Sequence, residues 1–204
     1  PAAHGGKRAT IMQITETGLP GLLVLEPRVF GDSRGFFLET WSRATFAAAG
    51  LDYDFVQDNH ARSGPAGVLR GLHFQLPPAA QAKLVRVTRG AVFDVAADLR
   101  LGSPTYGKWY GLVLSAENFR QMLIPRGFAH GYLTLAPDTE FLYKVDAPYA
   151  PDLDSGLAWD DPGLAVAWPL AEHGIPAPVL SDKDRRLPGL GGFASPFRFA
   201  PPGR

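Results

Sequence analysis

Glycine and proline interrupt the chain so often that long helices have little room to form. The 204 residues include 23 Gly and 19 Pro, together about a fifth of the chain, against an average usage of about 12%. Between them stand short apolar runs rich in Val, Leu, Phe and Tyr, each bounded by Gly, Pro, Asp or Ser. This pattern is typical of strands in antiparallel sandwiches and barrels. We therefore predict an all-β fold, built as a small antiparallel double-sheet barrel with a few short helices.

Eight of these runs are predicted as strands, and two other segments as short helices. Within 91–97, Phe93 and Val95 alternate with Asp94, which is the period of two expected of a half-buried strand. A helix is expected over 42–50, between a serine and a glycine of the types that cap helices, and a shorter one over 181–186, opened by a serine. The predicted strands are 22–25, 68–76, 83–88, 91–97, 108–114, 121–124, 132–135 and 141–145.

The charge balance and the absence of cysteine exclude several classes of protein. Twenty Lys and Arg offset 20 Asp and Glu, whereas proteins that bind nucleic acid or membrane surfaces usually carry a basic patch. With no Cys, disulfides, iron–sulfur clusters, thiolate zinc sites and cysteine nucleophiles are removed. No apolar run reaches the ~20 residues of a membrane helix, and the start of the chain does not read as a signal peptide. We expect a cytoplasmic protein with one domain over 1–204, loosely ordered at 1–10 and 190–204.

Two of the five histidines stand in stretches that resemble the signature motifs of the cupin superfamily of small β-barrels. His73 opens the sequence His-Phe-Gln, and His130 ends the sequence Pro-Arg-Gly-Phe-Ala-His. Metal-binding cupins carry His-x-His in the first motif and then a Glu, where this chain has Gln75 and Lys83. Because protonated lysine offers no lone pair, we expect no metal here and a His73 that is free for acid–base chemistry.

Arg70 and His73 differ in parity, so a regular strand would point their side chains to opposite faces. Gly71 stands between them, and a glycine inside a strand often marks a bulge. We hypothesise that a bulge at Gly71 brings both side chains to one face.

A longer series of motifs gives a closer match. It comprises 30–37, 56–60, 70–75 (Arg-Gly-Leu-His-Phe-Gln), 83–87 (Lys-Leu-Val-Arg-Val), 92–95, 114–118, 124–131, 140–144 (Glu-Phe-Leu-Tyr-Lys) and 180–184 (Leu-Ser-Asp-Lys-Asp). In this order the series resembles the dTDP-4-dehydrorhamnose 3,5-epimerases and their nucleotide-sugar epimerase relatives. The resemblance runs from about residue 21 to residue 188, which is far more specific than any single short motif.

The resemblance implies a cupin-like jelly roll that converts dTDP-4-keto-6-deoxy-D-glucose to dTDP-4-keto-L-rhamnose by inverting C3 and C5. The C4 ketone acidifies the hydrogens on both carbons, so a base removes one and a proton returns on the opposite face. No cofactor is expected, because the ketone accepts the electrons, and the sequence has neither a Gly-x-Gly-x-x-Gly motif nor a P-loop. Members of the family are homodimers in which an N-terminal strand crosses between subunits, and 22–25 is a candidate for that strand.

By the same resemblance, four residues carry the chemistry. His73 is the base that abstracts the proton, and Asp184 is the carboxylate that orients and polarises it. Lys83 places a positive charge near the developing C4 enolate. Tyr143 is the proton donor on the opposite face.

Nine further positions match residues that contact the substrate in the family. Arg34 and Arg70 are matched to the diphosphate, whose oxygens suit a guanidinium group. Gln57 and Asn59 are matched to the thymine and sugar edges, and Tyr149 to stacking on thymine. The other matches are Glu39, His130, Asp154 and Lys183.

Other functions stay open at the level of sequence. Arg126 and Asp154 depart from the residues that relatives often carry, which leaves room for a C3-only or C5-only epimerase in a deoxysugar tailoring pathway. A 3,4-ketoisomerase is a further reading on the same substrate, although the presence of Tyr143 favours epimerisation. A non-catalytic nucleotide-sugar-binding cupin ranks lower because His73 is present, and a metal-dependent cupin ranks lower because the His-x-His motif is missing.

Overall fold

The computed structural model describes residues 12–201, which form thirteen strands, one short α-helix and three 3-10 turns. The strands are β1 (Met12–Glu16), β2 (Leu23–Pro27), β3 (Phe30–Asp32), β4 (Gly35–Phe37), β5 (Gln57–Ser63), β6 (Leu69–Gln75), β7 (Lys83–Arg89), β8 (Ala91–Asp98), β9 (Trp109–Ser115), β10 (Gln121–Ile124), β11 (Phe128–Thr134), β12 (Thr139–Val145) and β13 (Asp154–Gly156). The helix is α1 (Arg43–Ala48), and the 3-10 turns are Pro151–Leu153, Asp184–Arg186 and Leu190–Gly192. Within the described range, no helix is long and apolar enough to cross a membrane.

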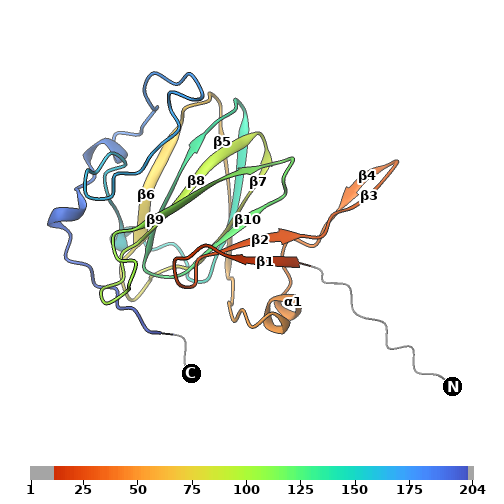
Figure 1. Cartoon of the computed structure of the whole chain (residues 1–204), viewed down its shortest axis with the longest axis horizontal. Coiled ribbons are helices and arrows are strands. Elements are labelled where there is room, and N and C mark those ends of the chain that lie inside the picture. Colours follow the sequence, from red (N-terminus) through yellow and green to blue (C-terminus); the bar gives the residue numbers. More distant parts are fainter. Residues whose placement is uncertain (1–11, 202–204) are drawn as a thin grey trace.

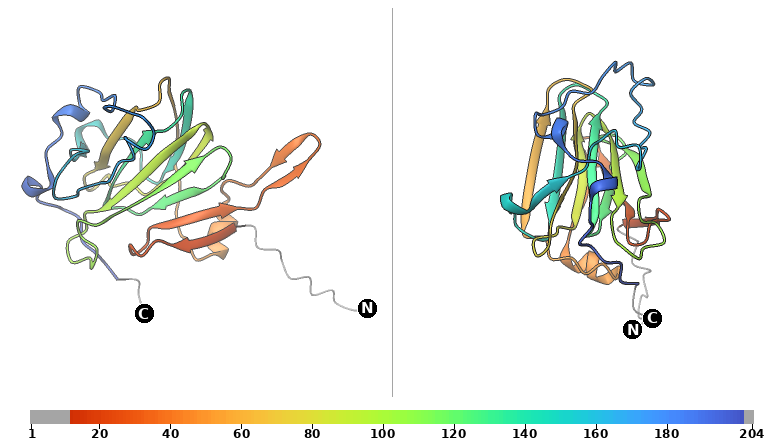
Figure 2. Two further views of the ribbon diagram at one scale, coloured as in Figure 1. Left: turned by 45° about the horizontal axis from the view of Figure 1, so that its top comes forward. Right: turned by 90° about the vertical axis from the view of Figure 1, so that its left-hand side faces the viewer.

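Two antiparallel sheets face each other and form the barrel (Figures 1 and 2). One sheet has six strands in the order β1-β2-β10-β7-β12-β5, and the other has five in the order β13-β6-β11-β8-β9. From β5 onward the chain passes repeatedly from one sheet to the other, except between β8 and β9, which are neighbours in the five-stranded sheet, as in a jelly roll. This arrangement confirms the predicted all-β double-sheet fold.

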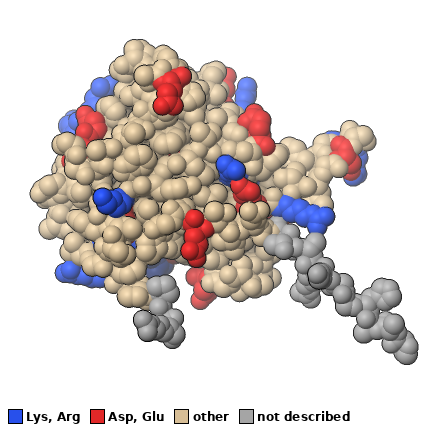
Figure 3. Space-filling model, in the orientation of Figure 1, with Lys and Arg blue, Asp and Glu red and all other residues tan. Residues whose placement is uncertain are grey.

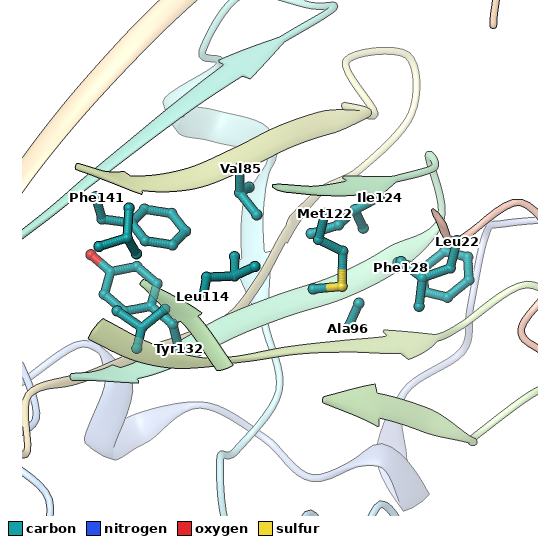
Figure 4. Close-up of a cluster of buried hydrophobic side chains, with 11 residues drawn as sticks. Leu22, Val85, Ala96, Leu114, Met122, Ile124, Phe128, Tyr132 and Phe141 are labelled. Atoms are coloured by element: carbon teal, nitrogen blue, oxygen red, sulfur yellow. The ribbon is translucent and has the colours of Figure 1, made fainter. Parts of the chain in front are cut away.

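The space between the sheets is filled by a single apolar cluster (Figure 4). Leu22 and Phe128 lie at one end of the cluster, while Tyr132 and Phe141 lie at the other, with ring centroids 4.1 Å apart. The inward positions of each strand recur every second residue. The same rows of inward positions therefore continue from the apolar core into the polar end of the barrel.

The last segment of the chain covers the outer face of the five-stranded sheet. Phe197 is buried against this face, and the backbone of Leu101 exchanges hydrogen bonds of 3.0 Å with Phe197 and Phe199. The Ser195 hydroxyl donates to the carbonyl of Leu99 at 2.5 Å. The prediction that 190–204 is loose is therefore wrong for 190–201, because Phe197 supplies apolar area that outweighs the glycine-rich composition around it. Residues 1–11 and 202–204 lie outside the described residues.

All eight predicted strands are confirmed, with shifts of a few residues at their ends. The alternation in 91–97 predicted one buried face, but β8 is buried on both, since the C-terminal segment covers the side opposite the core. Helix α1 begins at its predicted cap Ser42, whose hydroxyl accepts from the N–H of Thr45, and ends one residue early, at Ala49. The predicted helix over 181–186 is wrong: only the 3-10 turn Asp184–Arg186 forms.

A hairpin made of β3 and β4 projects away from the barrel (Figures 1 and 2). Its aromatic side chains are unusually exposed, Phe36 at 62% and Phe37 at 71%. Charged atoms of both signs lie at its far end, whereas acidic and basic groups are scattered over the rest of the face that Figure 3 shows. An apolar arm of this kind is typical of a surface that another chain covers.

Candidate active site

A bulge in β6 places two predicted site residues on the same side of the sheet. His130 of β11 pairs with His73, but Tyr132 pairs with Arg70, so two residues of β6 stand opposite one of β11. Gly71 permits the bulge: its φ is +123°, and a Cβ there would lie 2.6 Å from the Cα of Gly131. Arg70 and His73 consequently line one cavity, which confirms the hypothesis drawn from their parity.

His73 forms a close pair with Asp184. The Nε2 atom of the imidazole lies 2.5 Å from Oδ1 of the carboxylate, which is only 4% exposed. The Ser181 hydroxyl donates to the second carboxylate oxygen at 2.9 Å and accepts from the Asp184 N–H at 3.1 Å. Burial alone would raise the pKa of Asp184, but the hydrogen bond from His73, its charge and the bond from Ser181 lower the pKa on balance. The carboxylate is therefore held ionised against the imidazole.

Two further titratable side chains enter from the six-stranded sheet. Burial lowers the pKa of Lys83 to about 8, against the opposing charges of Asp154 and Asp94. Burial also raises the pKa of Tyr143, although Arg70 opposes this. Near neutral pH, Lys83 is thus a poorly hydrated cation and Tyr143 a protonated phenol.

These residues surround a cavity of about 500 Å³ at one end of the barrel. Its wall includes His73, Lys83, Tyr143 and Asp184, the four predicted catalytic residues. Three predicted substrate-binding residues also line it, namely Arg70, His130 and Lys183. Among the described residues, no three or more His, Asp or Glu side chains gather in a group that could hold a metal ion.

Four more predicted residues, Asp154, Tyr149, Gln57 and Asn59, form a hydrogen-bonded network beside the cavity. The network begins at Lys183, whose ammonium group pairs with Asp154. The Tyr149 hydroxyl donates to Asp154 at 3.0 Å, and the Tyr149 N–H donates to Gln57 at 3.0 Å. Gln57 in turn donates to Asn59 at 2.9 Å. These five residues, which are far apart in the sequence, thereby form one polar edge beside the cavity.

The remaining two predicted residues are Arg34 and Glu39. In a single copy of the chain, both lie apart from this cavity. Arg34 is at the turn of the β3–β4 hairpin, where its side chain is 87% exposed and pairs with Asp32. Glu39 accepts a hydrogen bond of 2.5 Å from the Thr45 hydroxyl, next to α1. Neither side chain is among the residues that line the cavity.

Sequence reasoning missed three polar residues of this region. Asp94 is fully buried beside His130, Tyr132 lines the cavity, and Ser181 holds Asp184. The sequence does carry a signal for Asp94, because this acidic residue has apolar residues before and after it in the same strand. The alternation was instead interpreted as an outward, solvated position.

Fold and site together define a cupin-type double-sheet barrel with an acid–base site at one end. A histidine–carboxylate pair, a partly buried cation and a protonated phenol share one cavity, with an arginine and a lysine that suit an anionic substrate. Such a constellation is equipped to move protons to and from carbon next to a carbonyl group.

Comparison with known proteins specifies the family. A family model described as dTDP-4-dehydrorhamnose 3,5-epimerase matches residues 16–191. The dTDP-4-dehydrorhamnose 3,5-epimerase of Pseudomonas aeruginosa is 53% identical over 176 residues, covering 86% of this chain and 94% of the relative. The chain therefore belongs to the dTDP-4-dehydrorhamnose 3,5-epimerase family, as the sequence resemblance predicts.

Solved structures agree in fold. The dTDP-4-dehydrorhamnose 3,5-epimerase of Bacillus anthracis, with TDP and pyrophosphate bound, has a TM-score of 0.83 and 50% identity over 88% of this chain and 99% of that one. A 3,5-epimerase of Legionella pneumophila in complex with dTDP-4-keto-L-rhamnose has a TM-score of 0.86 and 43% identity over 93% of this chain and 99% of that one.

Proposed function

We propose that the chain inverts C3 and C5 of dTDP-4-keto-6-deoxy-D-glucose to give dTDP-4-keto-L-rhamnose, without a cofactor. One observation carries the proposal: the His73–Asp184 pair, Lys83 and Tyr143 line the same cavity. Membership of the family supports it, as does the binding of dTDP-4-keto-L-rhamnose by the Legionella relative. The proposal includes a cytoplasmic location, which is in keeping with the absence of cysteine.

Each inversion needs one proton to leave and one to return. Neutral His73 takes the proton from carbon, and the C–H electron pair moves into the C4 ketone to form an enolate. Asp184 stabilises the imidazolium that results, since it already accepts from Nε2. The Lys83 ammonium stabilises the enolate oxygen. Tyr143 then donates its phenolic proton to the opposite face, and both residues return to their resting states by exchange with water.

The polar edge beside the cavity is assigned to the nucleotide and the sugar. Arg70 is exposed at the cavity wall, where its guanidinium group suits the diphosphate. Tyr149 is 56% exposed and held by its hydroxyl at Asp154, so its ring is free to stack on thymine. Gln57 and Asn59 offer amide groups to the base and the sugar, while His130 and Lys183 contact the sugar diphosphate from inside the cavity.

We further propose that the enzyme is a homodimer in which the hairpin of one copy reaches the cavity of the other. Within one chain, β2 pairs with β1 and β10 of its own sheet, so we assign the crossing to the β3–β4 hairpin rather than to 22–25. The exposed Phe36 and Phe37 support this, and so does Arg34, which lies outside its own cavity. We extend the same proposal to Glu39, which follows the hairpin by two residues.

A mixing experiment tests the dimer. Arg34→Ala and His73→Asn variants, each inactive alone, are co-refolded, so that hybrid dimers contain one site with both residues intact. Random pairing of equal amounts makes about half of the dimers hybrid, each with one intact site of two, so recovery of about a quarter of wild-type activity is expected. If light scattering gives a monomer, or if mixing restores nothing, the shared site is wrong.

The activity itself is tested by proton NMR of dTDP-4-keto-6-deoxyglucose in D₂O with the enzyme. We expect the C3–H and C5–H signals both to disappear, and His73→Asn to prevent this. Loss at one carbon only would instead indicate a monoepimerase, which the 3,5-epimerase relatives described above do not favour. A folded protein that binds the nucleotide sugar without exchange at either carbon would be a binding protein.

A further inference from the structure

Asp94 is a carboxylate in a position that the fold would otherwise give to an apolar residue. It lies on the face of β8 that points between the sheets, and its neighbours on that face, Val92 and Ala96, belong to the apolar core. Asp94 is 0% exposed. Burying an ionised carboxylate is costly unless it is paired and hydrogen bonded, so packing does not account for this residue.

The carboxylate uses only one of its two oxygens for a hydrogen bond. Oδ1 lies 2.9 Å from Nε2 of His130, which is itself buried. Oδ2 is buried and has no hydrogen-bond partner in the part of the chain that the structure describes. A buried polar atom left in this state usually has a functional reason.

His130 connects Asp94 to the active site. It pairs across the strands with His73, and both rings line the cavity. Because Nε2 of His130 faces Asp94, Nδ1 is the ring nitrogen left for a ligand in the cavity. The molecule thus holds a second histidine–carboxylate pair, one strand away from His73–Asp184 and more deeply buried.

Lys83 is the second group that Asp94 affects. Burial removes water from the Lys83 ammonium group and lowers its pKa, and the charges of Asp154 and Asp94 oppose this. Lys83 faces these titratable or charged groups: Arg70 and His73 on β6, Asp94 on β8, His130 and Tyr132 on β11, Tyr143 on β12, Asp154 on β13, and Lys183 and Asp184 near the last 3-10 turns.

Each of the three carboxylates in that set already has a basic partner, which for Asp94 is His130. Asp184 pairs with His73, and Asp154 pairs with Lys183. Asp94 alone retains a buried oxygen without a partner. Asp94 therefore acts on Lys83 as a charge in the same interior, without a hydrogen bond between them, and its effect on the pKa of Lys83 is smaller than that of Asp154.

We propose that Asp94 is a positioning residue of the active site, which holds the ring of His130 through Nε2 and adds its negative charge to the space between the sheets that Lys83 enters. The inference rests on the proposed function, in which the charge of Lys83 stabilises the enolate. Asp94 touches neither substrate nor reacting atoms, and it acts through its two neighbours.

The test is the pH dependence of kcat/KM, from pH 6 to 10, for the wild type and Asp94→Asn. Lys83 must be protonated to act, so kcat/KM of the wild type is expected to fall above about pH 8, the pKa of this lysine. Because the negative charge of Asp94 raises the pKa of Lys83, removing it lowers that pKa, so the fall should begin at a lower pH in Asp94→Asn. Glu117→Gln removes the same charge from an exposed turn, and its profile should match that of the wild type.

Lys83→Arg identifies the group that titrates. A guanidinium group keeps its proton over this range, so the alkaline fall should vanish in Lys83→Arg, and adding Asp94→Asn should not restore it. An alkaline fall that stays at the same pH in Asp94→Asn would overturn the proposal. So would a fall that moves equally in the Lys83→Arg background.

A measurement that needs neither activity nor a variant separates this inference from the proposed function. In ¹⁵N spectra of the histidine-labelled wild type, His130 should carry its proton on Nε2, since an ionised Asp94 accepts there. A proton on Nδ1, with Nε2 bare, would mean that Asp94 is the donor and would refute the proposal. If the enzyme shows no exchange at C3 or C5 while His130 has the expected tautomer, the proposed function fails and the positioning role of Asp94 stands.

Discussion

The pair of His73 and Asp184 allows a quantitative prediction for Asp184→Asn. The substitution preserves size but removes the charge whose oxygen lies 2.5 Å from Nε2 of His73. A hydrogen bond to a charged group contributes about 1.5–3 kcal/mol, which corresponds to roughly 10- to 150-fold in rate. Because the imidazolium forms only after proton abstraction, the loss should fall on kcat and leave KM nearly unchanged.

The assay is deuterium exchange at C3 and C5, followed separately by NMR under saturating substrate. Both rates should fall by the same factor, since one base serves both carbons. Asp182→Asn, two residues away on an exposed position, is the matched control and should exchange at the wild-type rate. Wild-type exchange in a folded Asp184→Asn protein would refute the role of the carboxylate.

The same pair makes a prediction about stability and pH. The folded-state pKa of Asp184 is lowered on balance: burial raises it, and the bonds from His73 and Ser181 outweigh burial. A carboxylate of this kind contributes stability above its unfolded pKa of about 3.9 and loses it as pH falls through the lower folded value. The difference in unfolding free energy between wild type and Asp184→Asn should therefore shrink below about pH 4, as urea titrations at several pH values can measure.

Three other substitutions probe the roles assigned above. Tyr143→Phe should lower product formation by roughly 10²- to 10⁴-fold while His73 still removes protons, and wild-type turnover at both carbons would contradict its role. Gly71→Ala should lower the stability by about 1–3 kcal/mol and disrupt the site, because the new Cβ would lie 2.8 Å from the carbonyl of His130; Gly64→Ala, with nothing within 4 Å, is its control. Lys83→Met should abolish activity yet raise stability at pH 7 by up to about 3 kcal/mol, since burial lowers the pKa of Lys83 to about 8. That gain should disappear as pH rises from about 8 toward 10.5, where the folded wild type also carries a neutral lysine, and equal stability at pH 7 would contradict the burial argument.

The eight strands predicted from the sequence each contain a run of apolar residues. The five strands that were missed lack such a run or are too short to show one. β5 reads Gln-Asp-Asn-His-Ala-Arg-Ser and is an edge strand held by β12 alone. β3, β4 and β13 have three residues each, which is too short for periodicity to appear. β1 is mostly exposed and pairs only with β2, so little burial shaped its composition.

The site was predictable only where a family resemblance supplied long-range pairing. His73 and Asp184 are 111 residues apart in sequence, and no local pattern connects them. The C-terminal segment illustrates the opposite failure: its glycines predicted a loose end, and the burial of Phe197 depends on a sheet face formed by distant strands. The sequence shows Asp94 as an acidic residue in an apolar strand. Whether its side chain points inward depends on which face of β8 meets the core, and the sequence of the strand does not determine this.

Core and active site are built from the same rows of inward-pointing residues. On β7 the inward row begins with Lys83 and continues with Val85 and Val87, and on β12 Phe141 is followed by Tyr143. Patterns of hydrophobicity identify these rows but do not show where apolar residues give way to chemistry. The polar members reduce stability through their burial, and the proposed mechanism uses that burial, because water that would hydrate Lys83 would also weaken its field at the enolate.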